Sequence, residues 1–579
     1  MKTTLCQLAS QYIHSALAPW YLKSAAAALC CVPHEVRVVN ATVNQTHDAI
    51  LKILTDGAPE VLGLCCYIWN IETINALLGQ LRAALPKCYI VLGGPEVSFC
   101  ADTFLTQHPE VNGILIGEGE RSFAALLDAL DCGASLSSVP GLCRRAAGGT
   151  VTNSAPTPLT ELFCPYTPDY FADLGGRIAY IETTRGCPFT CAFCLSGRED
   201  RLRCFALEPA FHALEQLAQS GTKTIKFIDR TFNANEPRAL TIWKFLVQRN
   251  AEGAFLPGIC FHFEVAADLF SADCLAFLKT VPRGLFQFEA GLQSFHTETL
   301  AAVQRKTDTE HLCQNLRSIL AGDNIHLHID LIAGLPHENL ETFADSFDRA
   351  FALGAHQLQL GFLKLIYGSA LRRDAALYDL AATCNAPYEV TSTRWLTPVD
   401  FSVLAFAEQS LGRLYNSGRY VRSLPYLLGL WQDSAFDFFA KFGAACTQLG
   451  DFPAADALAQ RLFEFACTTM AADARLLRDL LALDILATRR AMRLPDFLKV
   501  PDDRLKRVNL ALKRGLHPPL TIENTSEKFR SGHIAFYILY SGDKGDLLAV
   551  CDYTAKDPIR GDFPVTTVPL SHFLSTGSC

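Results

Sequence analysis

The sequence predicts an α/β protein with three parts: an N-terminal doubly wound, Rossmann-like domain, a central partial barrel of six βα units, and an α-rich C-terminal domain with a β-strand tail. Short apolar runs alternate with helical patterns in two separate stretches of the chain, and helical periodicity dominates a third stretch before two final strand-like runs. Apolar strands alternating with helices are typical of parallel sheets covered on both faces. We place the boundaries at 1–135 for the first domain, 136–175 for a linker, 176–370 for the barrel and 371–579 for the last domain.

Length, charge and hydropathy limit the class of protein. The 579 residues are enough for about three or four domains. The net charge of −8 offers no basic surface for nucleic acid. No uninterrupted apolar run reaches the ~18 residues of a membrane span, and Gln7, Gln11 and His14 interrupt any signal-peptide core. We therefore expect a cytoplasmic protein that binds neither membranes nor nucleic acid.

The first domain is predicted from five strand-like runs, at 3–9, 35–42, 61–69, 88–94 and 113–117. Ligands of such sheets bind at the carboxyl ends of the strands. There the sequence has two glycine-containing turns, GGPE and GEGE, which would let the backbone approach a broad flat ligand closely. Tight turns with nothing bound are the alternative. The candidate binding residues at these ends are Tyr12, Tyr67, Trp69, Gly93, Gly94, Glu96, Gly117 and Glu118.

The second set of strands is expected at 177–184, 224–232, 259–266, 285–293, 325–335 and 356–366. Six βα units suit a partial barrel, whose chemistry lies at the carboxyl ends of its strands. The first of these strands runs into the segment TTRGCPFTCAFC, which contains Cys187, Cys191 and Cys194. The three cysteines therefore lie where a barrel would hold its active site.

The three closely spaced cysteines indicate a metal site, whereas the other cysteines of the chain have a simpler explanation. The 22 cysteines are scattered through apparent strands and helices, so most are expected to be reduced core residues, including the adjacent pairs Cys30–Cys31 and Cys65–Cys66. Three thiolates in one loop would hold a [4Fe–4S] cluster and leave one iron open. A structural zinc ion, or a cluster closed by Cys204 as fourth ligand, are the alternatives.

The motif CxxxCxxC with the aromatic Phe193 before its third cysteine resembles the signature of the radical S-adenosylmethionine (SAM) superfamily. The GGPE and GEGE turns resemble the cobalamin-binding domain that precedes many radical SAM domains. This resemblance covers roughly residues 1–370. It implies that SAM binds the open iron and is cleaved to a 5′-deoxyadenosyl radical, with reduced flavodoxin or ferredoxin as electron donor. It also implies an oxygen-sensitive enzyme that methylates an unactivated carbon with cobalamin as methyl carrier.

The same resemblance implies further site residues. Glu289, Gln293 and Ser294 in FEAGLQS, and Asp330 in HIDLIAGLP, are similar to residues that reach the SAM ribose. In FIDRTFNAN, Asp229 would accept from the SAM ammonium and Arg230 would pair with its carboxylate, whereas a structural Asp–Arg pair is the alternative. The cobalt-binding motif DxHxxG is missing, and His14 is interpreted as a cap or surface residue. We therefore expect cobalamin to bind without a histidine on cobalt.

Several functions stay open on sequence grounds. The cobalamin cofactor is compatible with a radical rearrangement or ring closure in place of methylation, and a non-catalytic sensor of the cluster or of cobalamin is a further alternative. In a further alternative the first domain binds no cobalamin and is empty or holds another ligand. Residues 371–579 resemble the uncharacterised C-terminal domain of one branch of these proteins, and their pattern predicts no role. The substrate cannot be read from the sequence.

Overall fold

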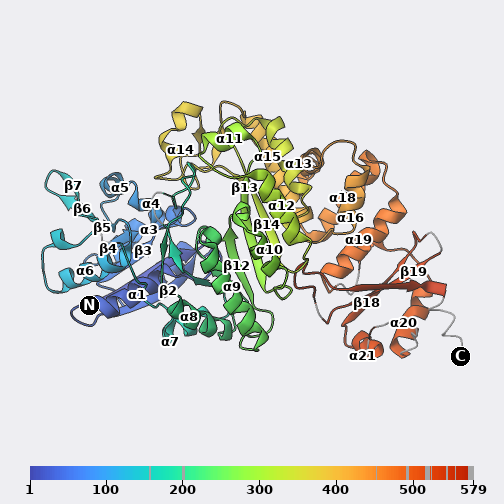
Figure 1. Ribbon diagram of the computed structural model, residues 1–579, viewed down its shortest axis with the longest axis horizontal. Coiled ribbons are helices and arrows are strands. Elements are labelled where there is room, and N and C mark those ends of the chain that lie inside the picture. The colour runs from blue at the N-terminus through green and yellow to red at the C-terminus, as the bar shows by residue number, and fades with distance from the viewer. Residues whose placement is uncertain are drawn as a thin grey trace.

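The structure is a computed structural model, and it describes residues 1–155, 158–197, 202–450, 453–490, 494–514, 522, 524–542, 545–554 and 556–571. Figure 1 shows the three parts side by side along the longest axis, with the N-terminal domain at one end, the partial barrel in the middle and the C-terminal part at the other end. The predicted fold class is confirmed.

The N-terminal domain is a seven-stranded sheet in the order β2-β1-β3-β4-β5-β6-β7. The first five strands are parallel, and β6 and β7 extend the sheet as an antiparallel hairpin. The strand order reverses at β1, with β2 on one side of it and β3, β4 and β5 on the other, and the gap between β1 and β3 is where doubly wound sheets bind ligands. The strands are β1 (Lys2–Ala9), β2 (Glu35–Thr42), β3 (Val61–Cys65), β4 (Tyr89–Gly93), β5 (Gly113–Leu115), β6 (Leu142–Ala146) and β7 (Gly149–Thr152).

Helices cover both faces of this sheet, as the continuous apolar strands predict. Two separate hydrophobic cores result, one under α1 and α6 and the other under α2, α3 and α5. Cys65 and Cys66 are buried as predicted, and Cys30 is half-buried against the core under α1 and α6. The prediction is wrong for Cys31, which is exposed because α1 ends just before it. The helices are α1 (Ala18–Leu29), α2 (His47–Thr55), α3 (Ile71–Ala84), α4 (Pro95–Ser98), α5 (Ala101–Gln107) and α6 (Gly119–Asp131).

The partial barrel is a six-stranded parallel sheet in the order β15-β14-β13-β12-β11-β8. Alternate residues point to opposite faces of a strand. Phe227, Phe263 and Phe288 are fully buried on the helix-covered face, whereas the lumen face carries polar side chains such as Lys226 and Glu289. The strands are β8 (Ala179–Ile181), β11 (Thr224–Phe227), β12 (Cys260–Val265), β13 (Phe286–Gln293), β14 (His326–Ala333) and β15 (Gln357–Phe362).

The helices of the barrel lie outside this sheet (Figure 1). A short β9–β10 hairpin follows β8 and frames the cysteine loop. The helices are α7 (Pro168–Leu174), α8 (Leu207–Gln219), α9 (Glu236–Ala251), α10 (Ala272–Leu278), α11 (Thr297–Ala302), α12 (Thr309–Leu320), α13 (Leu340–Phe351) and α14 (Ala370–Arg373); the short strands are β9 (Thr184–Arg185), β10 (Arg203–Cys204), β16 (Ala381–Ala382) and β17 (Val390–Ser392).

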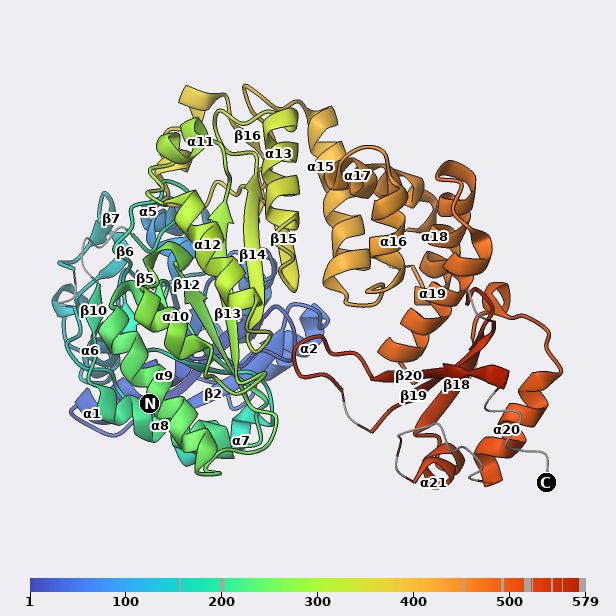
Figure 2. The same ribbon diagram turned by 45° about the vertical axis from the view of Figure 1, so that its right-hand side comes forward.

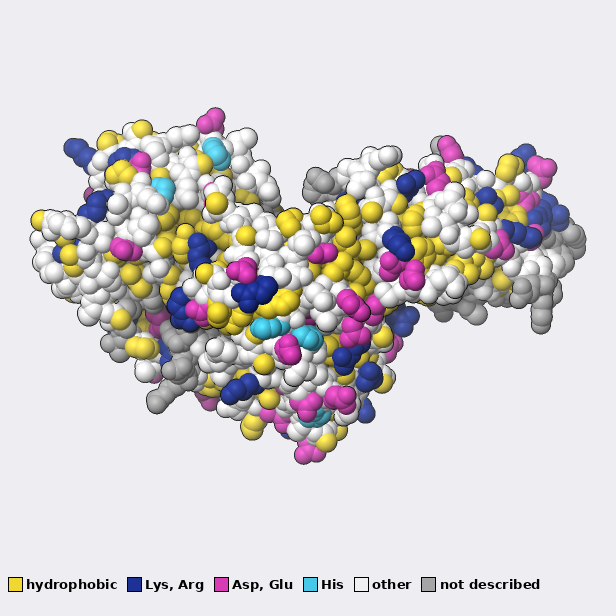
Figure 3. Space-filling model, turned by 90° about the horizontal axis from the view of Figure 1, so that it is seen from above, with side chains coloured by type: hydrophobic (Ala, Val, Ile, Leu, Met, Phe, Trp, Pro, Cys, Tyr) yellow, Lys and Arg dark blue, Asp and Glu magenta, His cyan; other side chains and the backbone are white. Residues whose placement is uncertain are grey.

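The C-terminal part begins as a helical layer against the barrel. Phe347 of α13 packs on Phe436 of α17 with ring centroids 5.5 Å apart, so the barrel core continues into these helices. On the face seen from above, hydrophobic side chains gather along the stretch that joins the central part to the C-terminal lobe (Figure 3). The helices are α15 (Pro398–Leu411), α16 (Ser423–Leu430), α17 (Ala435–Ala445), α18 (Ala455–Thr469), α19 (Ala474–Thr488), α20 (Arg504–Arg514) and α21 (Thr525–Arg530).

The predicted strand tail is an antiparallel sheet, β18 (Ile534–Leu539), β19 (Leu547–Asp552) and β20 (Val565–Pro569). Figure 2 shows it below α19, next to α20 and α21. Its inner face packs on α20 through Val508 and Leu512. Among the described helices, none combines the length and apolar character needed to cross a membrane.

Candidate cofactor sites

A cavity of about 930 Å³ lies between the carboxyl edge of the N-terminal sheet and the barrel. Polar and aromatic side chains from both domains form its walls. A broad ligand placed on the sheet edge would therefore also touch the start of the cysteine loop. From the first domain the predicted residues Tyr67, Trp69, Gly93, Gly94, Gly117 and Glu118 line it, and from the barrel side Tyr180, Glu182, Arg185, Gly186, Ser196 and Arg230 line it.

The glycine turns bring bare backbone to the cavity wall. Gly94 has φ +105°, and a Cβ atom there would lie 2.5 Å from the Cys66 carbonyl oxygen. Gly117 has φ +83°, again a conformation that side chains rarely adopt. The chain thus needs glycine at both turns for its own geometry, and the result is a wall without side chains that suits close approach of a large flat group.

Two aromatic rings form a platform at the cavity. Tyr67 and Trp69 are stacked with their centroids 4.4 Å apart and their planes 5° from parallel. The Trp69 indole nitrogen donates to the Leu8 carbonyl oxygen at 3.1 Å, which fixes the ring at the end of β1. Trp69 stays 43% exposed, so the ring face that Tyr67 does not cover is available to a ligand.

Two predicted residues lie elsewhere, as a correction to the sequence analysis. Tyr12 is not among the described cavity residues; it is 73% exposed and stacks under the Arg177 guanidinium, because the turn after β1 directs it outward. Glu96 is buried and accepts from the Tyr388 hydroxyl at 2.9 Å. Its place in the first turn of α4 aims it at the segment after the barrel instead of at the cavity.

His14 lines the cavity, whereas the sequence analysis interpreted it as a cap or surface residue. Its Nδ1 atom lies 2.6 Å from the Tyr180 hydroxyl oxygen, which joins the N-terminal domain to the first barrel strand. Burial, helped by the charge of Lys226, lowers the pKa of His14. A neutral imidazole held by Tyr180 is thus part of the wall between the two domains.

The three cysteines of the motif lie in one loop after β9. Cys191 is buried, and Cys187 and Cys194 are half-buried. Each sulfur has a polar neighbour. The Thr231 hydroxyl oxygen lies 3.4 Å from the Cys187 sulfur, and the Ser196 amide donates to the Cys194 sulfur at 3.4 Å. Arg305 donates to Cys191 at 3.6 Å. Burial raises the pKa of Cys191, and the Arg305 charge opposes this shift. Hydrogen bonds to sulfur of this kind favour thiolates and tune iron–sulfur clusters.

The three thiols of this loop are not gathered as they would be around a single zinc ion. A zinc ion with Zn–S distances of about 2.3 Å draws its ligand atoms to within about 4 Å of one another. Among the described residues, the groups whose ligand atoms all lie within 4.8 Å of one another do not include this loop. Cys204 is exposed on β10, opposite Thr184. Phe193 is half-buried and packs against the barrel core, so it anchors the loop.

Asp229 holds the strand end that leads into the cysteine loop. Its carboxylate is buried and accepts from the Thr183 amide at 2.7 Å, the Thr183 hydroxyl at 2.5 Å and the Thr184 amide at 2.9 Å. Burial raises the pKa of Asp229, while these hydrogen bonds lower it. The carboxylate is thereby engaged by the protein itself, where the resemblance implied the SAM ammonium as its partner. Arg230, which is 57% exposed, lies beside the cavity with Glu264 at 3.8 Å.

The lumen of the barrel is charged. Glu289 accepts from Lys226 at 3.2 Å and lies 3.0 Å from His262 Nε2. Burial acts to raise the pKa of Glu289, but His262 and Lys226 outweigh it and hold that pKa at about 2. His328 Nε2 lies 3.0 Å from Asp330 Oδ1. Glu289 and Asp330 thus offer carboxyl oxygens on the lumen face, where a polar ligand would meet them.

Gln293 offers the clearest unmet hydrogen-bonding group at these strand ends. It has φ +73° beside a register shift between β13 and β14, and its Oε1 atom is buried without a partner. An unpartnered buried oxygen is costly, so this position fits a hydrogen-bond donor from a ligand such as SAM. Ser294 follows on the opposite side of the pleat, fully buried, and donates to Glu338 at 2.6 Å; it does not face the lumen.

Arg185 was not found by the sequence analysis, although it lies two residues before Cys187. Its guanidinium makes two hydrogen bonds to Glu182, at 2.9 and 3.0 Å, and one to Glu120 at 2.5 Å. Glu118 lies 3.6 Å from it and also pairs with Arg203. One arginine thus connects the GEGE turn of the first domain to the start of the cysteine loop.

Family models match the chain in three places. The B12 binding domain matches residues 9–127, the Radical SAM superfamily matches 181–350, and Protein of unknown function (DUF4080) matches 376–521. The chain thus contains a B12-binding domain and a radical SAM domain. The cofactors of these two domains, cobalamin and a [4Fe–4S] cluster with SAM, are those that the sequence predicted, and the cavity joins the two domains at their strand ends.

Curated relatives of this radical SAM protein include enzymes of two kinds. The cobalamin-dependent radical SAM methyltransferase TokK of Streptomyces tokunonensis is 26% identical over 60% of this chain and 50% of its own. An anaerobic magnesium-protoporphyrin IX monomethyl ester cyclase of Rubrivivax gelatinosus is 26% identical over 55% of this chain and 58% of its own. The chain spans about half the length of the first curated relatives it matches.

A solved structure supports the arrangement of the parts. The cobalamin-dependent SAM radical enzyme OxsB, solved with aqua-cobalamin bound, aligns over 91% of this chain and 84% of its own with a TM-score of 0.60. Because the sequences are only 16% identical, this likeness shows a shared fold. It extends beyond the B12-binding and radical SAM domains into the C-terminal part.

Proposed function

We propose that the protein is a B12-dependent radical SAM methyltransferase that methylates an unactivated carbon of its substrate. One observation carries the proposal: a single cavity reaches from the glycine turns of the B12-binding domain to Gly186 and Ser196 of the cysteine loop. Relatives named as cobalamin-dependent methyltransferases support it. When bound, the cluster supplies the electron that cleaves SAM to a 5′-deoxyadenosyl radical, and cobalamin supplies the methyl group.

The residues of the chain would hold and orient these groups. The thiolates of Cys187, Cys191 and Cys194 would hold three irons, and Arg305 would stabilise the Cys191 thiolate. Gly94 and Gly117 leave the cavity wall open to a corrin-sized face, against which Tyr67 and Trp69 would stack.

SAM and the substrate would occupy the lumen side. Gln293 Oε1 is one unpartnered acceptor there, and the carboxyl oxygens of Glu289 and Asp330 would accept from ribose hydroxyls or from substrate donors. Arg230 would pair with the SAM carboxylate from its half-exposed place beside the cavity. Reduced flavodoxin or ferredoxin would supply the electron, and the protein would work in the cytoplasm.

The test uses full-length protein reconstituted anaerobically with iron, sulfide and cobalamin, then given reductant and SAM that carries a deuterated methyl group. We expect 5′-deoxyadenosine and S-adenosylhomocysteine, measured by mass spectrometry, with the second product dependent on cobalamin. Cys191→Ser should abolish both, because the cluster is lost, and Cys204→Ser is the matched control that should keep both. An assembled cluster that leaves SAM intact would contradict the proposal and favour the sensor.

A radical cyclase is a second candidate, because one curated relative is a ring-forming enzyme. Product mass separates the two functions. A methyltransferase product gains the deuterated methyl group, with about one 5′-deoxyadenosine per methyl transferred. A cyclase or rearrangement product contains no deuterium from SAM, even though 5′-deoxyadenosine forms.

A further inference from the structure

Cys30, His34 and Asp128 come together at the amino edge of the N-terminal sheet. Cys30 directly follows α1, His34 directly precedes β2, and Asp128 lies in the last turn of α6. Connections from a helix to the next strand lie at the amino ends of the strands in such a sheet, whereas the cavity lies at the carboxyl ends. This group is therefore separate from the cofactor sites.

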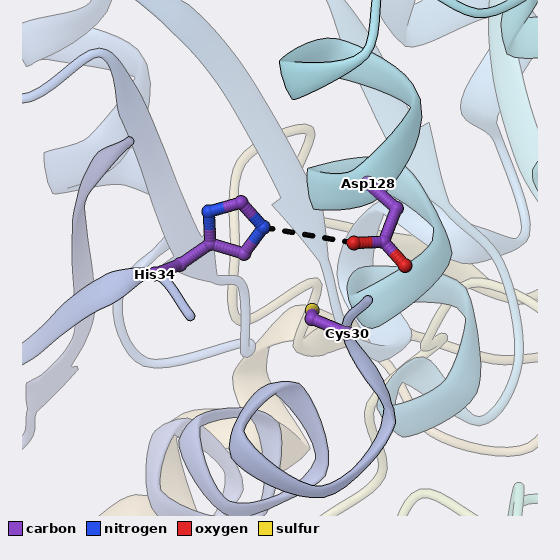
Figure 4. A group of neighbouring side chains, drawn as sticks. All are labelled: Cys30, His34 and Asp128. Atoms are coloured by element: carbon purple, nitrogen blue, oxygen red, sulfur yellow. Dashed lines mark ion pairs between the residues drawn. The ribbon is translucent and has the colours of Figure 1, made fainter. Parts of the chain in front are cut away.

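The three side chains point toward one another (Figure 4). One ligand atom from each lies within 4.8 Å of the other two. His34 Nε2 faces Asp128 Oδ1 at 3.7 Å, which is too long for a hydrogen bond. The Cys31 amide donates to both Asp128 oxygens, at 3.0 and 3.1 Å, and so fixes the carboxylate against the loop that carries Cys30.

His34 gives an independent sign of a missing ligand. Its side chain is only 1% exposed, yet its Nε2 atom has no hydrogen-bond partner. Leaving a buried polar atom unsatisfied costs about 1–3 kcal/mol, so such atoms in native proteins call for an explanation such as an ion. Nδ1 faces the Met1 nitrogen at 3.4 Å, and Nε2 is thus the ring atom aimed at Cys30 and Asp128.

We propose that Cys30, His34 and Asp128 bind a divalent transition-metal ion of the zinc type. A thiolate, an imidazole and a carboxylate are the donors that Zn²⁺ takes in proteins, whereas Mg²⁺ and Ca²⁺ take oxygen donors. The fourth ligand comes from water or from Cys31, which is exposed beside the group. The spacing Cys-x₃-His, with a carboxylate from a distant helix, closes a site between two segments of the chain.

The proposed zinc ion would have a structural role at this edge of the sheet. β2 is an edge strand of the sheet, and the loop before it contacts α6 through Cys30, Cys31 and His34. Coordination joins that loop to α6 across 94 or more residues of chain, and metal-binding free energy becomes folding free energy when the ligands come from separate segments. The site would thus stabilise the B12-binding domain without touching its cofactor.

The test measures zinc in the full-length protein after anaerobic reconstitution of the cluster, so that the cysteines of the 187–194 loop are already occupied. After equilibrium dialysis against Zn²⁺, we expect about one tightly bound zinc per chain by mass spectrometry. X-ray absorption at the zinc edge should show one sulfur at about 2.3 Å and nitrogen or oxygen neighbours at about 2.0–2.2 Å, or two sulfurs if Cys31 is the fourth ligand.

Cys30→Ser, His34→Gln and Asp128→Asn should each weaken zinc binding by at least roughly tenfold. Cys164→Ser and His47→Gln, which change exposed residues elsewhere, are matched controls that should leave it unchanged. Unaltered cobalamin affinity in the variants would show that the domain is still folded. The proposal is overturned if the wild type binds no zinc, if its zinc shell lacks sulfur or has only sulfur, or if the triple variant keeps the ion.

Discussion

Replacing Asp229 tests whether this carboxylate holds the cysteine loop or the SAM ammonium. Asp229→Ala removes the acceptor of three hydrogen bonds from Thr183 and Thr184, at 2.5–2.9 Å. Three buried donors then lose their partner. At about 1 kcal/mol for each, the low end for unsatisfied groups because water can enter the space left by the carboxylate, the ordered loop loses about 3 kcal/mol. That shifts the balance between the ordered and the opened loop by more than about a hundredfold.

The assay is iron per chain and the electron paramagnetic resonance spectrum after anaerobic reconstitution. Asp229→Ala should bind much less iron, because the loop that carries Cys187 is no longer fixed. Asp229→Asn is the matched variant: its oxygen can still accept from the two amides and its NH₂ group can donate to the Thr183 hydroxyl, so iron should be largely retained.

SAM affinity decides between the two roles. A positioning role predicts that Asp229→Asn, with its cluster assembled, binds SAM nearly as the wild type does. A direct contact with the ammonium predicts that both variants assemble the cluster and both lose SAM affinity. Full iron content with a wild-type spectrum in Asp229→Ala would refute the reasoning from the loop geometry.

Three further predictions address other sites. Gln293→Asn should keep the cluster but weaken SAM binding about tenfold by loss of one hydrogen bond; equal affinity in calorimetric titration would exclude the contact. Gly94→Ala should lower both cobalamin affinity and the free energy of unfolding, each by roughly 1–3 kcal/mol, because a side chain is strained at φ +105°. Absorbance titration measures the affinity and thermal unfolding measures the stability. Gly79→Ala, which adds a methyl group in open space on α3, is the control and should change neither. Burial raises the pKa of Glu338 to about 7 from 4.5, so the fold favours the protonated form and the free energy of unfolding should fall as pH rises from about 4.5 to 7. Glu338→Gln should reduce that fall by up to about 3 kcal/mol. The variant should therefore gain more in Tm at pH 8 than at pH 5, and an equal gain at both pH values would contradict the prediction.

The strands and the cysteine loop follow from local sequence patterns. The apolar runs at 61–69 and 113–117 contain the fully buried strands β3 and β5, because a strand buried on both faces must be apolar throughout its length. The spacing of Cys187, Cys191 and Cys194 lies within one loop, so it constrains their positions without knowledge of the rest of the fold. The cofactor set was implied by the resemblance of the cysteine motif and of the GGPE and GEGE turns to the radical SAM superfamily and its cobalamin-binding domain.

Side-chain direction at the strand ends was less predictable. Glu289 and Gln293 lie on the lumen face of β13, but Ser294, one residue further, is on the other side of the pleat and bonds Glu338. Alternation along the strand contains this information, since an odd step reverses the side. Tyr12 and Glu96 had no such local signal, because the turns after β1 and β4 direct them away from the cavity.

The sequence by itself thus determined the main strands of the first two domains, their order, and which loop holds the thiols, since these depend on hydrophobic periodicity and short spacing. It did not predict β6 and β7, which extend the first sheet from within the stretch 136–175 that was expected to be a linker. Only the tertiary structure decided which distant groups meet. Arg185 reaches Glu120 across 65 residues, Arg305 reaches Cys191 across 114, and Cys31 reaches Asp128 across 97. Such pairs form because packed strands and helices bring their ends together, and no pattern within a short window of sequence records which ends those are.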